Sequence, residues 1–234
     1  MNKDFIFIIA LAFLNAAPSS YDLRDYNKVP EFREIVYSTN WSLVLISHLE
    51  SLYSSSHKTA LLSEQMLLDC CINEKTFSTK LMQLTFQWLV KNGVMLENDY
   101  PYKGLIGTCK FEKSKSVMNI RGYKKLGSFG GSCADEDEMK EYLYGTGPLL
   151  VGFNGKGLQN YSGGIIDFTE SQCPSNVINH VGLLVGYGTS NGIDYWIVKN
   201  TWGKSWGEKG YFRIRRGKGT CGINCLVVTA LVSF

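Results

Sequence analysis

Three histidines and seven cysteines are the residues of this chain that could carry acid–base or nucleophilic chemistry. His48 falls in an apolar stretch with helical spacing and His57 in the polar run SSSHK, so both are predicted to lie in solvent at the surface. No ligand spacing links them to a metal site, and neither a metal nor another cofactor is expected. His180 stands in the run NHVGLLVGYG, where a buried structural role and a catalytic role are both open.

The N-terminal segment of residues 1–16 is predicted to be a signal peptide. It has a short cationic start, an apolar stretch from Phe5 to Leu14, and small residues after it. The stretch is shorter than the roughly 20 apolar residues that span a bilayer, and a buried N-terminal strand is the alternative. Seven cysteines behind such a leader favour a secreted protein, extracellular or endolysosomal, with a few disulfides, and the odd number leaves at least one thiol unpaired.

The charge balance excludes one class of partner. The net charge of +3 comes from 24 basic and 21 acidic residues, which are spread along the chain without a polybasic cluster. Nucleic-acid binding is therefore not expected, and neither is a membrane partner. We expect a folded monomer, because the 44% hydrophobic content supplies enough apolar surface for a core.

The elements that must position these residues change character along the chain. Apolar spacing predicts helices over 39–53, 81–90 and 135–144, the second closed by Gly93. After Pro148 short β-type runs follow, and we expect strands over 149–153, 181–187, 195–198, 211–215 and 226–231. Helices followed by strands indicate an α+β fold with two lobes, and a groove between lobes is a usual place for a binding site.

Two segments then identify a family resemblance: NHVGLLVGYG at 179–188 and DYWIVKNTWGKSWGEKGYFRIRR at 194–216. Together with YDLR, LSEQMLLDC and ENDYPY, in that order upstream, they make the chain resemble a papain-like cysteine peptidase of the cathepsin L type. The resemblance implies a papain-like two-lobed fold, with a helical lobe over 17–112, a β-rich, antiparallel barrel-like lobe over 113–234, and a cleft between them.

The resemblance assigns catalytic roles to two residues of the second lobe. The family needs a thiolate, a histidine that takes and returns its proton, and a group that orients the imidazole. His180 and Asn200 match the positions of the histidine and its orienting group. Trp202 resembles the indole that shields their hydrogen bond from water.

The nucleophile position holds no cysteine. IVYSTNWSLV at 35–44 replaces the family pattern QGxCGSCWAF, and anchoring on Trp41 places Asn40 where the cysteine belongs. An amide nitrogen cannot be made a nucleophile by a neighbouring imidazole. Depending on the register, Glu34 or Ile35 takes the position of the glutamine that stabilises the oxyanion. Either residue removes that amide donor, and Glu34 also brings a charge of the wrong sign.

Further positions of the expected cleft also depart from the family. A cysteine pair of the family is replaced by Tyr37 and Phe77, so that bridge is absent. Two glycines that let substrate backbone approach the cleft wall are replaced by Thr79 and Lys80. The cleft is expected to be lined by Thr79 and Lys80 together with Glu34, Ile35, Trp41 and Trp202.

The resemblance also implies disulfides. By motif position Cys70 pairs with Cys109, and Cys173 pairs with Cys221. The remaining cysteines stay unassigned, namely Cys71, Cys133 and Cys225.

Two short sequons could accept N-linked glycans, at Asn40 and Asn160. Asn160 is the better candidate because it lies in a glycine-rich loop, whereas Asn40 opens a helix inside the expected cleft and precedes a bulky tryptophan.

The predicted leader and the substitutions at the nucleophile and oxyanion positions favour a secreted, catalytically inactive homologue that binds a peptide or protein in its cleft. The alternative is a peptidase with residual activity through Ser38, Thr39 or Ser42, each one or two positions off register. A structural matrix component is a third reading, but no repeat or low-complexity segment supports it.

Overall fold

The computed structural model describes residues 16–33, 40–54, 60–71, 78–127 and 132–233. The predicted signal peptide, His57 and the stretch around Glu34 lie outside these ranges. In chain order the elements are β1 (Tyr21–Asp22), η1 (Leu23–Tyr26), α2 (Asn40–Ser54), α3 (Glu64–Cys70), α4 (Thr79–Asn92), β2 (Val94–Met95), η2 (Lys113–Lys115), β3 (Ser116–Lys125), α5 (Glu136–Thr146), β4 (Leu149–Phe153), β5 (Ile165–Ile166), β6 (His180–Ser190), β7 (Ile193–Lys199), β8 (Tyr211–Arg215), η3 (Thr220–Gly222) and β9 (Leu226–Ser233).

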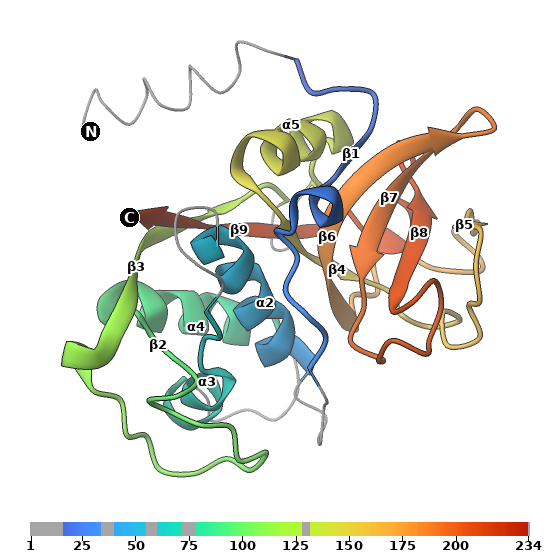
Figure 1. Ribbon diagram of the computed structural model, residues 1–234. Helices are drawn as coiled ribbons and strands as arrows, with labels where there is room; N and C mark the ends of the chain where they lie inside the picture. Colours follow the sequence, from blue (N-terminus) through green and yellow to red (C-terminus); the bar gives the residue numbers. More distant parts are fainter. Residues whose placement is uncertain (1–15, 34–39, 55–59, 72–77, 128–131, 234) are drawn as a thin grey trace.

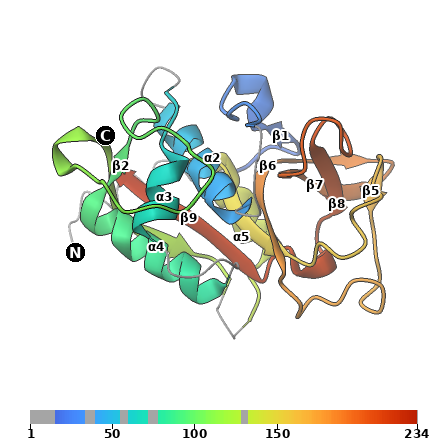
Figure 2. The ribbon, with the colours of Figure 1, turned by 90° about the horizontal axis from the view of Figure 1, so that it is seen from below.

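The helices and the sheet occupy different sides of the molecule. Figure 1 shows α2, α3 and α4 together on one side and the strands β6, β7 and β8 on the other, with β9 reaching toward the helices. Figure 2 gives the same division from below. The predicted α+β architecture is confirmed.

The described strands form one open sheet in the order β2-β3-β9-β4-β6-β7-β8-β5, with β1 added to β6. Pairing is antiparallel except between β5 and β8, which run parallel. The two ends of this order, β2 and β5, do not pair, so the expected barrel-like closure is wrong. Closure would need the end strands to be tilted and staggered until they bond to each other.

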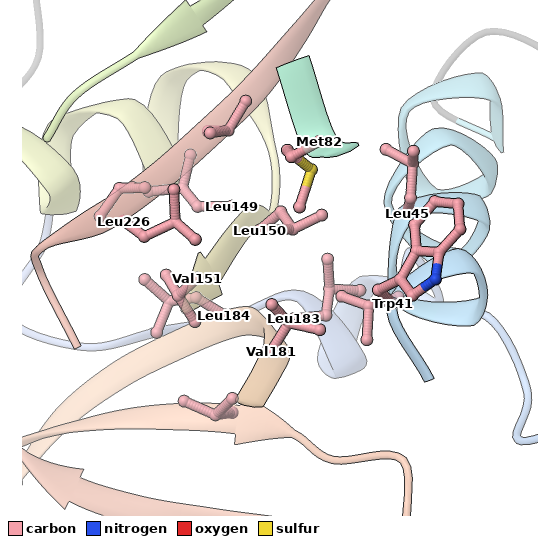
Figure 3. Close-up of a cluster of buried hydrophobic side chains, with 14 of the residues drawn as sticks. Trp41, Leu45, Met82, Leu149, Leu150, Val151, Val181, Leu183, Leu184 and Leu226 are labelled. Atoms are coloured by element: carbon pink, nitrogen blue, oxygen red, sulfur yellow. The ribbon is translucent and has the colours of Figure 1, made fainter. Parts of the chain in front are cut away.

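α2 is the central helix of the core. Trp41 and Leu45 face Leu183 and its neighbours on the sheet (Figure 3), and Trp41 is only 2% exposed. Nearly every residue from Trp41 to Leu52 is buried, because α2 is packed against α3, β4, β6 and β9. A helix covered on all faces has no polar side to present to solvent.

His48 is therefore not a surface residue, and the prediction for it was wrong. Its side chain is fully buried and its Nε2 accepts the backbone N–H of Ala230 at 2.9 Å. This bond joins α2 to β9. Burial lowers the pKa of His48 to about 4, although a hydrogen bond with the backbone of Pro148 opposes the shift.

Capping residues fix the start of two helices, α4 and α5, and a glycine fixes the end of α4. Ser78 caps α4 by accepting the N–H of Leu81, and Gly93 ends it with a φ of 91°, which a side chain would resist. Asp135 caps α5, whose first turn carries Glu136, Asp137 and Glu138, and these acidic residues suit the positive end of the helix dipole. None of the described helices has both the length and the apolar character needed to cross a membrane.

Candidate active site

The sheet brings His180 and Asn200 together. His180 is the first residue of β6, and Asn200 directly follows β7. β6 and β7 are antiparallel partners with Leu183 opposite Lys199, so the start of one strand lies beside the end of the other. The Nε2 atom of His180 lies 2.8 Å from Oδ1 of Asn200.

The hydrogen bonds of Asn200 determine which nitrogen of His180 carries the proton. Oδ1 also accepts the backbone N–H of Thr201 at 2.8 Å, which identifies this atom as the carbonyl oxygen. An oxygen that only accepts requires a donor opposite it, so Nε2 of His180 holds a hydrogen. Nδ1 is then the basic nitrogen, and the orienting role expected of Asn200 is geometrically possible.

Aromatic rings enclose this pair. The ring of Trp202 lies 4.9 Å from that of His180, and Trp206 meets Trp202 edge-on, also at 4.9 Å. Phe153 packs edge-on against the imidazole from the other side at 5.3 Å. Burial by these rings lowers the pKa of His180, and the hydrogen bond to Asn200 raises it less. The imidazole is therefore neutral at pH 7.

Asn40 and Trp41 stand at the start of α2, the helix that packs against β6. Asn40 is half-buried, and Trp41 is buried in the core. A crevice of about 10 Å³ separates α2 from the sheet and is lined by Leu43, Val44, Leu183 and Asn200, among others. It has room for one water at most.

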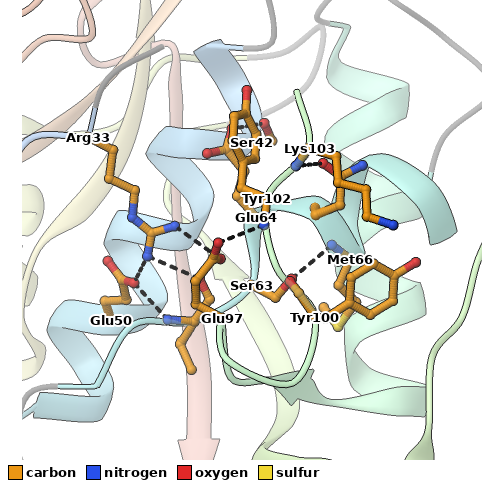
Figure 4. A network of polar contacts seen from close by, with 12 residues as sticks. Arg33, Ser42, Glu50, Ser63, Glu64, Met66, Glu97, Tyr100, Tyr102 and Lys103 are labelled. Carbon is orange, nitrogen blue, oxygen red and sulfur yellow. Dashed lines mark hydrogen bonds and ion pairs between the residues drawn. The ribbon is translucent and has the colours of Figure 1, made fainter. Parts of the chain in front are cut away.

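Ser42 does not face the His180 pair. It is fully buried, and its hydroxyl donates to Oε1 of Glu64 at 2.7 Å (Figure 4). Burial raises the pKa of Glu64, while the Ser42 hydroxyl lowers it. A hydroxyl used in this way links α2 to α3 and is not presented to a substrate. The other two candidate hydroxyls, on Ser38 and Thr39, lie outside the described residues.

Arg33 and Glu50 form a partly buried ion pair that the sequence had not revealed. Arg33 contacts Oε1 of Glu50 and donates to the backbone oxygen of Leu62 at 3.0 Å, and Glu97 lies 3.8 Å away on the other side (Figure 4). Burial raises the pKa of Glu50 to about 7 despite the guanidinium. The pair connects the loop that follows η1, to which Arg33 belongs, to α2. In the sequence, nothing distinguishes Glu50 from a surface carboxylate.

The structure joins six of the seven cysteines in disulfides. Cys70 is bonded to Cys109 and Cys173 to Cys221, the pairs that the resemblance implied. A third bridge joins two residues that the sequence left unassigned, Cys133 and Cys225. Cys71 is the free thiol. It follows α3 directly, and burial raises its pKa.

The remaining expected cleft residues are only partly described. Lys80 is exposed in the first turn of α4, where Thr79 is the first residue. Glu34 and Ile35 lie outside the described residues, as do Tyr37 and Phe77, the positions of the missing cysteine pair. A larger hollow, of about 540 Å³, opens at the start of α5 beside Glu136 and Cys225 and includes none of the predicted catalytic residues. Within the described ranges, no group of three or more His, Cys, Asp or Glu is arranged to hold a metal ion.

Comparison with known proteins identifies a single family. The model of the papain family cysteine proteases matches residues 17–231. The chain is 37% identical over 209 residues to a viral cathepsin of Heliothis zea nuclear polyhedrosis virus, covering 88% of this chain and 54% of that protein. A viral cathepsin of Spodoptera litura multicapsid nucleopolyhedrovirus is 38% identical over 209 residues, covering 88% and 59%. The chain thus spans little more than half the length of these relatives.

Solved structures give the same result. The digestive procathepsin L 3 of Tenebrio molitor larval midgut superposes with a TM-score of 0.78 at 32% identity, covering 94% of this chain and 71% of that one. The procathepsin L2 proteinase from the same tissue gives a TM-score of 0.80 at 31% identity, covering 91% and 68%.

Proposed function

Because the chain belongs to the papain family of cysteine proteases, we propose that it is a catalytically inactive member that retains the family's cleft for binding a peptide or protein. We further propose that it is secreted, and that it acts as a monomer. The observation that carries the proposal is the state of its cysteines: six are bridged, and the remaining thiol is half-buried at the end of α3 and packs against the core.

No thiol of the chain is suited to act as a nucleophile. Reactive cysteines are thiolates with lowered pKa values in electropositive, partly exposed settings. Burial instead raises the pKa of Cys71. The position that the family motif assigns to the nucleophile holds Asn40, whose amide has no proton that the neutral His180 could remove to make a nucleophile.

The alternative, a peptidase with a substitute hydroxyl, has less support. Ser42 donates its hydroxyl to Glu64 inside the core. Turning it toward His180 would leave a buried carboxylate without this partner, which costs about 1 to 3 kcal/mol or more. Ser38 and Thr39 are then the hydroxyls that this alternative must invoke.

A cleavage assay tests the loss of catalysis. The purified chain is incubated with a panel of fluorogenic peptides and, separately, with a peptidyl epoxide that alkylates active-site thiols, with papain as positive control. We expect no cleavage above a buffer blank and no epoxide adduct on any cysteine peptide. Turnover abolished by His180→Ala would contradict the proposal and favour the substitute hydroxyl.

A binding experiment tests the retained cleft. The chain is used to select from a random peptide library, and the selected peptides are titrated against it and against two variants. Trp202→Ala removes a ring beside His180, while Trp88→Ala removes a half-buried ring on α4 that packs on Phe111 instead. Binding weakened by Trp202→Ala and unaffected by Trp88→Ala supports use of the cleft, and the reverse pattern would contradict it.

A further inference from the structure

The two sequons of the chain sit in opposite structural settings. In the first, Asn40 begins α2, Trp41 is buried in the core, and the Ser42 hydroxyl is bonded to Glu64. A glycan is bulky and requires a surface position. One attached to Asn40 would have to leave from the first turn of the central helix, so this sequon is unsuited to the folded protein.

The second sequon, Asn160-Tyr161-Ser162, lies in the loop between β4 and β5, on the outside of the β-rich side (Figure 2). Asn160 and Ser162 are exposed, and neither side chain forms a hydrogen bond with another described residue. The middle residue points inward: the Tyr161 hydroxyl donates to the oxygen of Gly164 at 2.6 Å and accepts the N–H of Arg213 at 3.1 Å. Tyr161 thus anchors the loop while both reacting ends of the sequon face solvent.

The loop is also in contact with the aromatic rings beside His180. Trp206 donates its indole N–H to the oxygen of Gln159 at 3.0 Å, and its ring lies 5.5 Å from that of Tyr161. Trp206 in turn packs on Trp202, which packs on His180. Asn160 is therefore the surface residue between the two residues that hold Trp206.

We propose that Asn160 is the N-glycosylated residue of this chain, and that its glycan covers the Trp206–Trp202 end of the site beside His180. In the modification, Nδ2 of Asn160 bonds to C1 of the first sugar of a lipid-linked oligosaccharide diphosphate. The bond between C1 and the diphosphate oxygen breaks, the lipid diphosphate leaves with the electron pair, and the amide loses one proton to a base of the transferase. Small peptides still reach the cleft, but a folded partner is excluded from this end. The inference does not depend on the loss of catalysis.

Expression through a secretory pathway tests the modification. The chain is placed behind a heterologous secretion leader in insect cells, so that the result does not depend on its own first residues. We expect one glycan, removed by peptide N-glycosidase, with the treated peptide carrying aspartate at position 160. Asn160→Gln and Ser162→Ala should both abolish the gel shift, while the matched variant Asn40→Gln should retain it.

The opposite pattern overturns the proposal. A secreted chain without any glycan, or a glycan lost in Asn40→Gln and kept in Asn160→Gln, would show that the exposed sequon is not the acceptor. Because both substitutions at the second sequon fall on exposed side chains, misfolding does not complicate the readout.

Radical footprinting tests the shielding. Oxidation of Trp202 and Trp206 is measured by mass spectrometry in the glycosylated protein and in Asn160→Gln, with Trp88 on α4 as internal control. Slower oxidation of both indoles in the glycosylated protein, with equal oxidation of Trp88, supports the proposal. Equal oxidation at all three positions would show that the glycan points away from the site.

Discussion

The β-rich side and the helical side of the molecule differ in how their catalytic positions are built. On the β-rich side, His180 and Asn200 are held by the β6–β7 pair, bonded to each other and enclosed by Trp202 and Phe153. On the helical side, the start of α2 carries Asn40, the residue that the proposed alignment puts at the family's nucleophile position. The first group joins two paired strands and packs against the core, whereas the second is a single half-buried side chain at a helix start.

This difference shows why a preserved histidine is weak support for activity. Nε2 of His180 and Oδ1 of Asn200 are bonded to each other, while Nδ2 of Asn200 has no hydrogen-bond partner among the described residues. Removing either residue leaves the bonded atom of the other without its partner, which costs about 1 to 3 kcal/mol. Their hydrogen bond therefore contributes to stability whether or not the chain is catalytic. A nucleophile has no such structural function, so its position is free to change once catalysis is not needed.

The largest expected effect is on peptide hydrolysis, when a nucleophile is introduced at the start of α2. Asn40→Cys places a thiol at the family's nucleophile position, but we expect no useful hydrolysis. The oxyanion donor is still missing at position 34 or 35, which costs about a hundredfold to a thousandfold. Steady-state cleavage of a fluorogenic peptide measures this.

A fuller repair serves as the matched comparison. It adds glutamine at position 34 or 35, cysteines at 37 and 77 and glycines at 79 and 80, and it should give measurable cleavage that His180→Ala abolishes. A turnover number near the typical enzyme value of about 10 per second for Asn40→Cys alone would contradict this prediction. It would mean that a single substitution on the helical side is enough to give an active enzyme.

The second prediction compares two disulfides. Replacing both cysteines of a pair by serine should lower the free energy of unfolding by about 2 to 5 kcal/mol. Cys133–Cys225 closes a loop with a sequence separation of 92, and Cys70–Cys109 closes one with a separation of 39. Loop-closure entropy therefore makes the Cys133–Cys225 bridge more stabilising than the other by about 0.8 kcal/mol. Urea unfolding under non-reducing conditions measures both losses. A larger loss for Cys70–Cys109 would show that local packing on the helical side outweighs chain entropy.

The elements that the sequence predicted well are those whose signal is local. β4 and β8 have the expected bounds because β4 is a short apolar run after Pro148, and β8 is a short alternating run after Gly210. Gly93 ended the second helix as expected because its positive φ is a backbone requirement. The His180–Asn200 pair followed from long motifs in one hairpin.

What the sequence could not predict depends on contacts between distant segments. β3 has a charged, alternating sequence, and it becomes a strand by pairing with β9 more than a hundred residues later. The bridge between Cys133 and Cys225 and the Ser42–Glu64 hydrogen bond are likewise tertiary. His48 seemed a surface residue because helical spacing reveals one apolar face, and it does not reveal that α2 is covered on every face.

The third prediction uses the pH dependence of stability to compare the two buried histidines. The pKa of His48 is about 4 in the folded chain against 6.5 for an unperturbed histidine, so the unfolded state binds the extra proton first as pH falls. Its stabilising contribution is complete above pH 6.5 and is lost between 6.5 and about 4. The loss is on the order of 3 kcal/mol at pH 4. Glu50, with a raised pKa, changes stability in the opposite direction as pH rises toward 7.

The contribution of His48 is isolated by difference. Urea unfolding of the wild type and of His48→Gln is measured from pH 7 to pH 4, with His180→Gln as the comparison on the β-rich side. The difference in free energy of unfolding between the wild type and His48→Gln should become smaller as pH falls. His180→Gln should act in the same direction, because burial lowers the pKa of that residue as well. A gap that stays constant for His48→Gln would mean that its imidazole is reached by water.

The smallest effects are expected within the His180 pair itself, where two substitutions should move one pKa in opposite directions. Burial is the larger influence on the pKa of His180 and lowers it, whereas the hydrogen bond to Asn200 raises it. Asn200→Ala removes the acceptor and should lower that pKa further. Trp202→Ala opens the site to water and should raise it, because the charged imidazole is then better solvated. NMR titration of the histidine ring protons measures both. Shifts of the same sign would show that the ring and the amide do not act separately, and the β-rich side would then be less preorganised than its hydrogen bonds indicate.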